Sequence, residues 1–351
     1  MRRWLTVGIL VGVIVVGGGA IWWLFLSSFG ERQWQTGQER LKAQGYRLEY
    51  GSVERSGFPF KLVWTLHDVS LSHDGDGDGS PPFRGEADGL RLTSLPWEPQ
   101  RVTFRVEGRH RWTVDTKGKA GLVDIAIGAA EGTIGPQPEA SGWRLDSRLR
   151  DIVAQPRANA TGATGAAGAT GDLHIAEATV QVDAPLRLDA LTLDARLDRI
   201  DLPQDFGLGT VVETLGVKGE VRPLPHDLAA PGLQKWQAAG GRLTLTAADV
   251  RFGAVDGGAN GTLGLDRQLR LSGDLDLRLR QPNRVLDLGV ERGWVGDKQR
   301  TLYAMAIGLF TRQAADGEPE AAMQMAFRNG ALWLGPIRIA NLPPVVPLAR
   351  P

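Results

Sequence analysis

The chain has no cysteine among its 351 residues. Disulfide bonds, thiolate metal sites and a cysteine nucleophile are therefore excluded. Aromatic residues make up only 7% of the chain, and its 40 basic and 40 acidic residues leave no net charge. A balanced charge gives no electrostatic reason to expect nucleic acid as a partner.

Catalytic motifs are also missing from the sequence. The five histidines form neither an HExxH frame nor a pair at the helical spacing of a zinc site. There is no Gly-x-Ser-x-Gly elbow and no phosphate-binding loop. We therefore expect a protein that is not an enzyme, with no catalytic residues, no cofactor and no resident metal.

One acidic loop, Asp74 to Gly79, alternates aspartate and glycine like the opening of a calcium-binding loop. The twelfth position of such a loop should be glutamate, but here it is Gly85, and Glu86 comes one residue late. A solvated hairpin loop is therefore the favoured interpretation, and calcium binding is the alternative. His67 and His73 flank this loop, and we expect both to be exposed.

A long hydrophobic run, Trp4–Phe29, contains no charged residue and is long enough to cross a bilayer as a helix. Arg2 and Arg3 precede it, and flanking basic residues stay in the cytoplasm. We expect residues 1–30 to be a signal anchor, which makes the chain a single-pass protein of the bacterial inner membrane with its body in the periplasm. The alternative is a cleaved signal peptide, which would give a mature protein starting near Gly30.

The body of the chain has many glycines and long stretches in which apolar and polar residues alternate. This pattern predicts a mainly β (α+β) fold of curved antiparallel sheets, with a few packing helices after the transmembrane helix. Asn329-Gly330 predicts a hairpin between 322–327 and 331–339. Helices are expected over 31–43, 231–239, 283–292 and 300–311. The other strand-like segments are 46–50, 60–64, 69–71, 90–92, 102–106, 112–114, 175–182, 186–197, 217–221, 243–245, 250–252, 261–265 and 269–279.

Residues 158–171 interrupt the alternation with glycine at every third position and alanine or threonine between. A collagen helix would need more triplets and proline within them, so a flexible Gly/Ala/Thr loop is predicted. This loop divides the body into a helix plus a first β-rich region, 31–157, and a second β-rich region, 172–351. Glycines within the strands, such as Gly264 and Gly273, are expected to help a sheet bend.

Phe58 and Phe60 flank Pro59 in the most unusual apolar motif. A functional interpretation is a docking or lipid-contact edge near the membrane. The favoured alternative is structural: proline is tolerated at the start of a strand, and both rings enter the core.

Arg105, Arg109 and Arg111 belong to a local basic stretch, with Arg101 and His110. This stretch could contact anionic lipid headgroups. The favoured alternative is the solvated face of a strand, with the apolar residues of 102–106 on the opposite face.

Four segments carry a resemblance to a known family: Ser56–Phe60, Trp236–Leu245, Gly330–Pro336 and Leu342–Pro344. With the anchor and the helix that follows it, they resemble the membrane-anchored family called domain of unknown function 2125. The resemblance implies an AsmA-like periplasmic protein with long strand arrays. Larger AsmA-like relatives are implicated in moving or organising lipids toward the outer membrane. It implies no catalytic residues.

Two functions follow as expectations. The first is an envelope protein that binds or guides membrane lipid along an apolar groove of a curved sheet. The second is a membrane-tethered scaffold that binds envelope protein partners through a sheet edge or an apolar patch.

Overall fold

The computed structural model describes residues 38–346, except 40, 44, 76–81, 116–121, 138–140, 158–170, 188, 206, 226–229, 294, 314–316 and 336. The predicted anchor and all but one residue of the predicted glycine-rich loop lie outside these residues. So does most of the predicted helix 31–43. In the part of the chain that the structure describes, no helix is long and apolar enough to cross a membrane.

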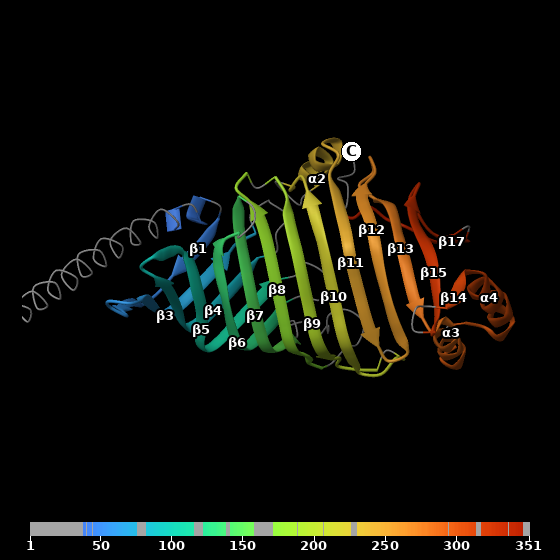
Figure 1. The fold of residues 1–351 in the computed structure, drawn as a ribbon, viewed down its shortest axis with the longest axis horizontal. Helices are drawn as coiled ribbons and strands as arrows, with labels where there is room; N and C mark the ends of the chain where they lie inside the picture. The colour runs from blue at the N-terminus through green and yellow to red at the C-terminus, as the bar shows by residue number, and fades with distance from the viewer. Residues whose placement is uncertain are drawn as a thin grey trace, which may run out of the picture.

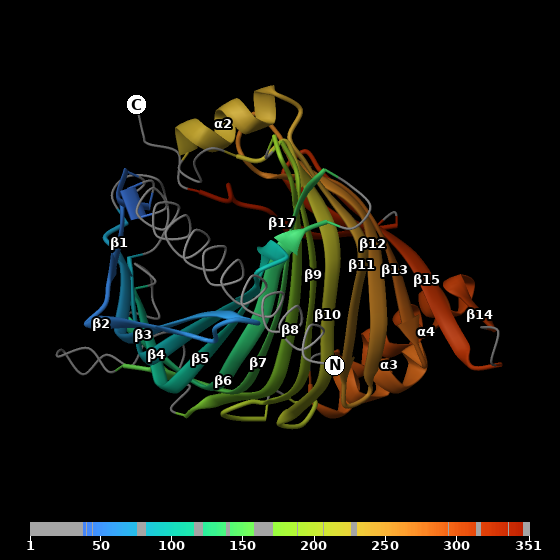
Figure 2. The same cartoon turned by 60° about the vertical axis from the view of Figure 1, so that its left-hand side comes forward.

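The fold is mainly β, as predicted, and consists of one 17-stranded antiparallel sheet with three short helices among the described residues. From β3 to β13 each strand pairs with the next one along the chain. Figures 1 and 2 show that these strands follow one long, curved surface. The strands are β1 (Tyr46–Glu49), β2 (Ser52–Ser56), β3 (Leu62–His73), β4 (Phe83–Leu95), β5 (Glu98–Asp115), β6 (Leu122–Pro136), β7 (Gly142–Pro156), β8 (Leu173–Pro185), β9 (Leu191–Asp201), β10 (Val211–Arg222), β11 (Arg242–Phe252), β12 (Val255–Leu265), β13 (Leu271–Arg280), β14 (Thr311–Gln313), β15 (Pro319–Arg328), β16 (Ala331–Leu334) and β17 (Ile337–Asn341).

Short strands form the two edges of the sheet. β1 and β2 both pair with β3, each along a different half of it. At the other edge, β14 and β16 pair with β15, and β17 pairs with β16. β7 and β8 pair directly across the predicted glycine-rich loop, so the sheet continues between the two predicted β-rich regions.

The three helices lie at the ends of the strands (Figure 1). α2 (Ala230–Ala238) connects β10 to β11 and ends in a Schellman motif. Gly241 N–H donates to the Trp236 carbonyl at 2.9 Å, and Gly240, with φ +74°, donates to the Gln237 carbonyl at 3.0 Å. α3 (Pro282–Glu291) and α4 (Asp297–Phe310) lie at the opposite end and pack against each other and β15. All three helices confirm predicted ones.

Some strand predictions need correction. Asn329 and Gly330 both have positive φ and join β15 to β16, which confirms the predicted hairpin. Its second segment, 331–339, is not one strand, because the chain turns at Gly335 (φ +55°) and pairs back as β17. β2, β6, β7 and β14 were not predicted. The segments 102–106 and 112–114 belong to one strand, β5, which is irregular around Gly108.

An irregularity crosses the sheet from β3 to β10 at the same level of each strand. In each pairing there, the register skips at least one residue on both strands, such as Asp68 in β3 and Asp151 in β7. Asp68, Asp151 and Arg199 have φ near +50°, in the left-handed region. An extra residue in a strand exchanges the two faces of the alternation. Because neighbouring strands share the irregularity, the apolar residues lie on one face of the sheet and the polar residues on the other, both above and below it.

Candidate functional site

The strand register sorts the side chains into an apolar face and a polar face. One row of directly paired residues crosses twelve strands, β3 to β13 and β15, without a polar side chain. At about 4.8 Å per strand this row is roughly 50 Å long. The row is Leu66, Leu90, Val106, Ala130, Leu149, Ala178, Leu197, Leu215, Val250, Gly257, Leu279 and Ala321.

The row one residue away lies on the opposite face and is largely charged. Arg105 belongs to it and forms an ion pair with Glu131 at 2.9 Å. Arg150 approaches the same carboxylate at 3.7 Å, and Arg148 approaches Glu177 at 3.4 Å. These cross-strand pairs are exposed, so each contributes less than about 1 kcal/mol. This row is Thr65, Arg91, Arg105, Glu131, Arg148, Thr179, Arg196, Gly216, Asp249, Gly258, Arg278 and Ala322.

The apolar face is only partly covered by the described residues. Ile134, Trp143, Leu215 and Val217 point to this face and are between 37% and 43% exposed. Large apolar side chains in a single-layer sheet would ordinarily be buried against a second layer. An apolar surface of this extent is the kind of feature that marks a ligand or partner site.

At the start of the sheet the apolar face is closed by an aromatic cluster. The Tyr46 ring stacks on His73 with centroids 4.6 Å apart, and Phe83 bridges from His73 to Trp112 at 6.0 Å and 5.8 Å. Trp112 lies over Gly85, where an added Cβ would come within 2.5 Å of the indole. His73 is 5% exposed, so the prediction that it is exposed was wrong: its ring completes this packing.

The predicted basic stretch divides between the two faces. Arg105 lies on the polar face with Val106 on the opposite one, as the favoured interpretation predicted. Arg109 is almost fully exposed beside Asp88, whose carboxylate accepts its backbone N–H at 2.8 Å, and Arg111 is exposed opposite Glu86. His110 is buried on the apolar face, and that burial lowers its pKa, against the Gly108 backbone and the Asp88 carboxylate.

Phe58 and Phe60 do not enter the core. Phe58 is 46% exposed and Phe60 is 69% exposed, at the tip of the turn between β2 and β3. The favoured structural interpretation of this motif was therefore wrong about burial. A contact role for both rings stays a prediction.

Further exposed apolar side chains lie at the same end of the sheet and were not predicted. Trp97 and Leu186 lie in the β4–β5 and β8–β9 connections, and Trp143 is the second residue of β7, beside the β6–β7 connection. Each directly follows a proline or glycine: Pro96, Gly142 and Pro185. A large apolar residue beside a turn former in a hairpin connection is the signal that could have identified them.

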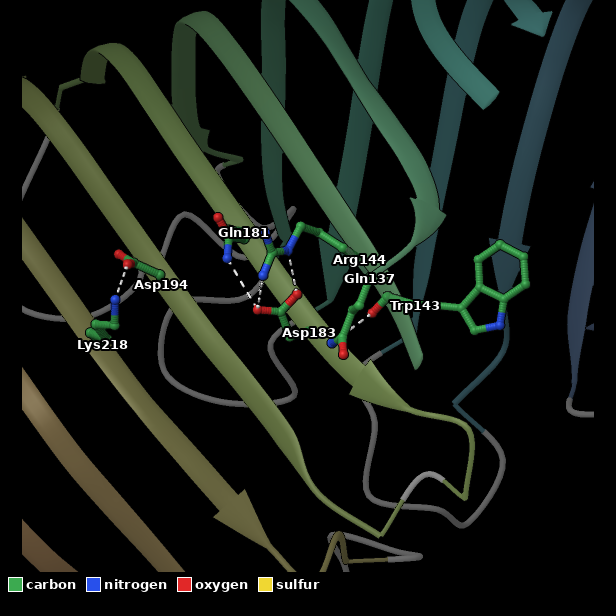
Figure 3. A network of polar contacts seen from close by, with 7 residues as sticks. All are labelled: Gln137, Trp143, Arg144, Gln181, Asp183, Asp194 and Lys218. Carbon is green, nitrogen blue, oxygen red and sulfur yellow. Dashed lines mark hydrogen bonds and ion pairs between the residues drawn. The ribbon is translucent and has the colours of Figure 1, made fainter. Parts of the chain in front are cut away.

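A polar network holds the tip that carries Trp143 (Figure 3). Arg144 donates to both oxygens of Asp183, at 2.6 Å and 3.1 Å, and Gln181 donates to the same carboxylate at 3.1 Å. The Arg144 hydrogen bonds hold the pKa of Asp183 below its usual value, although burial opposes this. Gln137 donates to the Trp143 carbonyl at 3.4 Å, and the Trp143 ring points away from the network.

One hollow on the polar face and the acidic loop carry less chemistry. A hollow of about 420 Å³ on the polar face is lined by residues of β6 to β9, among them Glu131, Arg148 and Asp194, whose charges already pair with neighbouring strands. Residues 76–81 of the predicted calcium loop lie outside the described residues. Asp74 is bound by Arg47 at 2.5 Å, and nowhere in the described part do three or more metal-ligating side chains gather.

No curated protein and no solved structure matches the chain significantly. A protein-family model does match it, over residues 23–343, which is nearly the whole chain and includes all of the sheet. The chain therefore belongs to the family described as "Uncharacterized protein conserved in bacteria (DUF2125)".

Proposed function

We propose that this protein binds membrane lipid, with acyl chains lying along the apolar face of the sheet, and that it is tethered to the bacterial inner membrane by residues 1–30 with its body in the periplasm. The observation that carries the proposal is the unbroken apolar row across twelve strands, with partly exposed side chains beside it. Each methylene removed from water against such a surface contributes about 0.8 kcal/mol.

The chemistry of the two faces supports an apolar chain over a polar ligand. The charged row on the opposite face is compensated by cross-strand ion pairs, such as Arg105 with Glu131 and Lys218 with Asp194. The twelve-strand apolar row offers area without hydrogen-bonding side chains, so it favours a long hydrocarbon and discriminates little between headgroups.

Lipid retained by the purified protein tests this proposal. The full-length protein is extracted in mild detergent and its bound lipid is measured by native mass spectrometry. Ile134→Glu and Val217→Glu each place a carboxylate among apolar side chains that are about 40% exposed. We expect each to reduce retained lipid at least about tenfold, because an ionised group loses more than 1.4 kcal/mol of contact with hydrocarbon.

Thr103→Glu is the matched control. Thr103 is exposed on the polar face of β5 and pairs with Thr133, the residue next to Ile134. It should retain wild-type lipid. A wild-type protein without lipid, or equal loss in all three variants, would contradict the proposal.

A membrane-tethered interaction protein is the second candidate. The observation that favours it is the edge strand β2, in which all five residues are exposed and which pairs only with β3 among the described residues. Val53→Pro would place a residue without a backbone donor in this edge strand. Loss of a co-purifying envelope protein, with lipid unchanged, would favour this candidate over lipid binding.

A further inference from the structure

One end of the sheet carries a line of exposed apolar residues in or beside the four connections β2–β3, β4–β5, β6–β7 and β8–β9. Phe60, Trp97, Trp143 and Leu186 are between 42% and 69% exposed. Each of the four residues lies two to four positions closer to this end of the sheet than one row of directly paired residues. The four tips are therefore level with one another. Alternate strands are about 10 Å apart, which makes the line roughly 30 Å long. The reference row is Leu62, Ser94, Val102, Ile134, Leu145 and Val182.

Basic residues accompany two of these tips. Lys61 directly follows Phe60, and Arg187 follows Leu186. Two carboxylates near the line are already compensated: Glu98 lies 2.8 Å from Arg101, and Asp183 lies 2.6 Å from Arg144. Large apolar side chains with cations beside some of them are the composition of protein surfaces that enter the interface of a bilayer with anionic headgroups.

We propose that this line of tips inserts into the headgroup region of a lipid bilayer. Separate projections about 10 Å apart suit a fluid bilayer, whereas a protein partner would need one matching pocket for each. The line is continuous with the apolar face, because Trp143 and Leu145 lie on that face two residues apart in β7. The inference rests on the proposed function for its purpose: insertion brings acyl chains to the start of the lipid-binding face. The bilayer is either the one that holds the anchor or a second one, since the chemistry of the contact is the same.

Absence of cysteine makes a single-label test direct. Phe58→Cys, at the β2–β3 tip, carries an environment-sensitive NBD fluorophore, and Ala254→Cys, in the turn between β11 and β12 at the other end, is the reference. Full-length protein is reconstituted into vesicles with anionic lipid. Nitroxide lipids are placed either in those vesicles or in added vesicles. We expect quenching at position 58 in one of the two arms, which identifies the bilayer, and no quenching at position 254 in that arm.

A triple variant should show at least about fivefold less quenching at position 58, because three inserted side chains are lost. It combines Phe60→Ser, Trp97→Ser and Leu186→Ser. The matched control is Met305→Ser on α4 at the other end: Met305 is 67% exposed, and the three tip residues are 68% or 69% exposed. It should leave the quenching unchanged. The proposal would be overturned if the correctly folded protein showed no quenching in either arm, or if the triple variant were quenched like the wild type. It would also be overturned if the tips bound a protein partner and no quenching were seen. Retained lipid is measured separately, so docking can fail while lipid binding holds.

Discussion

Replacing His110 with leucine should stabilise the folded protein. His110 is 5% exposed on the apolar face, between Ala87 and Ile127 of the neighbouring strands. Neither of its ring nitrogens has a hydrogen-bond partner of ordinary geometry among the described residues, and the weaker Gly108 backbone contact does not outweigh the effect of burial on its pKa. A buried polar group without a partner costs about 1–3 kcal/mol. Since leucine fills a similar volume without polar atoms, His110→Leu should raise the free energy of unfolding by about 1–3 kcal/mol at neutral pH.

The pH dependence of protein stability gives a second, independent test of this prediction. Burial lowers the pKa of His110 below the ordinary value of 6.5. As the pH falls below that value, the unfolded chain binds a proton that the folded protein does not, so the wild type loses stability. The loss is at most about 1.4 kcal/mol per pH unit for one group. His110→Leu removes this term, so its advantage should be larger at about pH 5.5 than at about pH 7.5.

The assay is urea unfolding of the detergent-solubilised full-length protein at both pH values, followed by tryptophan fluorescence. His174→Leu is the control: the His174 Nδ1 atom lies 3.1 Å from an Asp201 carboxylate oxygen, so this substitution should destabilise. A His110→Leu protein that is less stable than the wild type at neutral pH would refute the reasoning. An advantage that does not change with pH would refute the assignment of the titration to His110.

Two further stability predictions follow from the strands. Gly273→Ala should lower the stability measured in a thermal melt by at least about 2 kcal/mol, because φ is +138° and an added Cβ would lie 2.1 Å from the Thr262 carbonyl oxygen. Gly264→Ala, where the nearest contact of an added Cβ is at 3.2 Å, should lower it by less than about 1 kcal/mol. Equal losses of stability in the two variants would contradict the strain argument. Asp183→Asn should destabilise at neutral pH and flatten the acid limb of unfolding, since the lowered pKa of Asp183 contributes stability above 3.8 that is lost as the pH falls through the folded value. An acid midpoint that does not move would contradict this role for the Arg144 pair.

The sequence predicted the fold class and three helices well, because their signals are local. Period-two alternation follows from strand geometry alone, and the Gly240-Gly241 pair ends α2 by a local conformational preference. β6 and β7 were harder to recognise because their apolar positions are small or interrupted: Ala130 and Gly132 face the same side as Ile134. A glycine or alanine at such a position carries little strand signal.

The contact residues were less predictable than the elements. Phe58 and Phe60 were assigned to the core because large aromatic residues usually pack there, yet both are exposed at a tip. His73 was assigned to the surface because most histidines are exposed, yet it packs between Tyr46 and Phe83. Base rates describe a residue type, whereas burial depends on which strand lies beside it.

By itself, the sequence determined the two-faced strands and the absence of thiol chemistry, because alternation and composition are properties of the chain. The anchor ahead of the strands stays a prediction from hydrophobic length. Only the tertiary structure decided that the strands form one continuous sheet, that their register joins the apolar positions into a row across twelve strands, and that the row stays partly exposed. Alternation is the same for a sheet that is covered by a second layer and for one that is not. Whether an apolar face stays available to lipid depends on long-range pairing and coverage, and neither is encoded in any single segment.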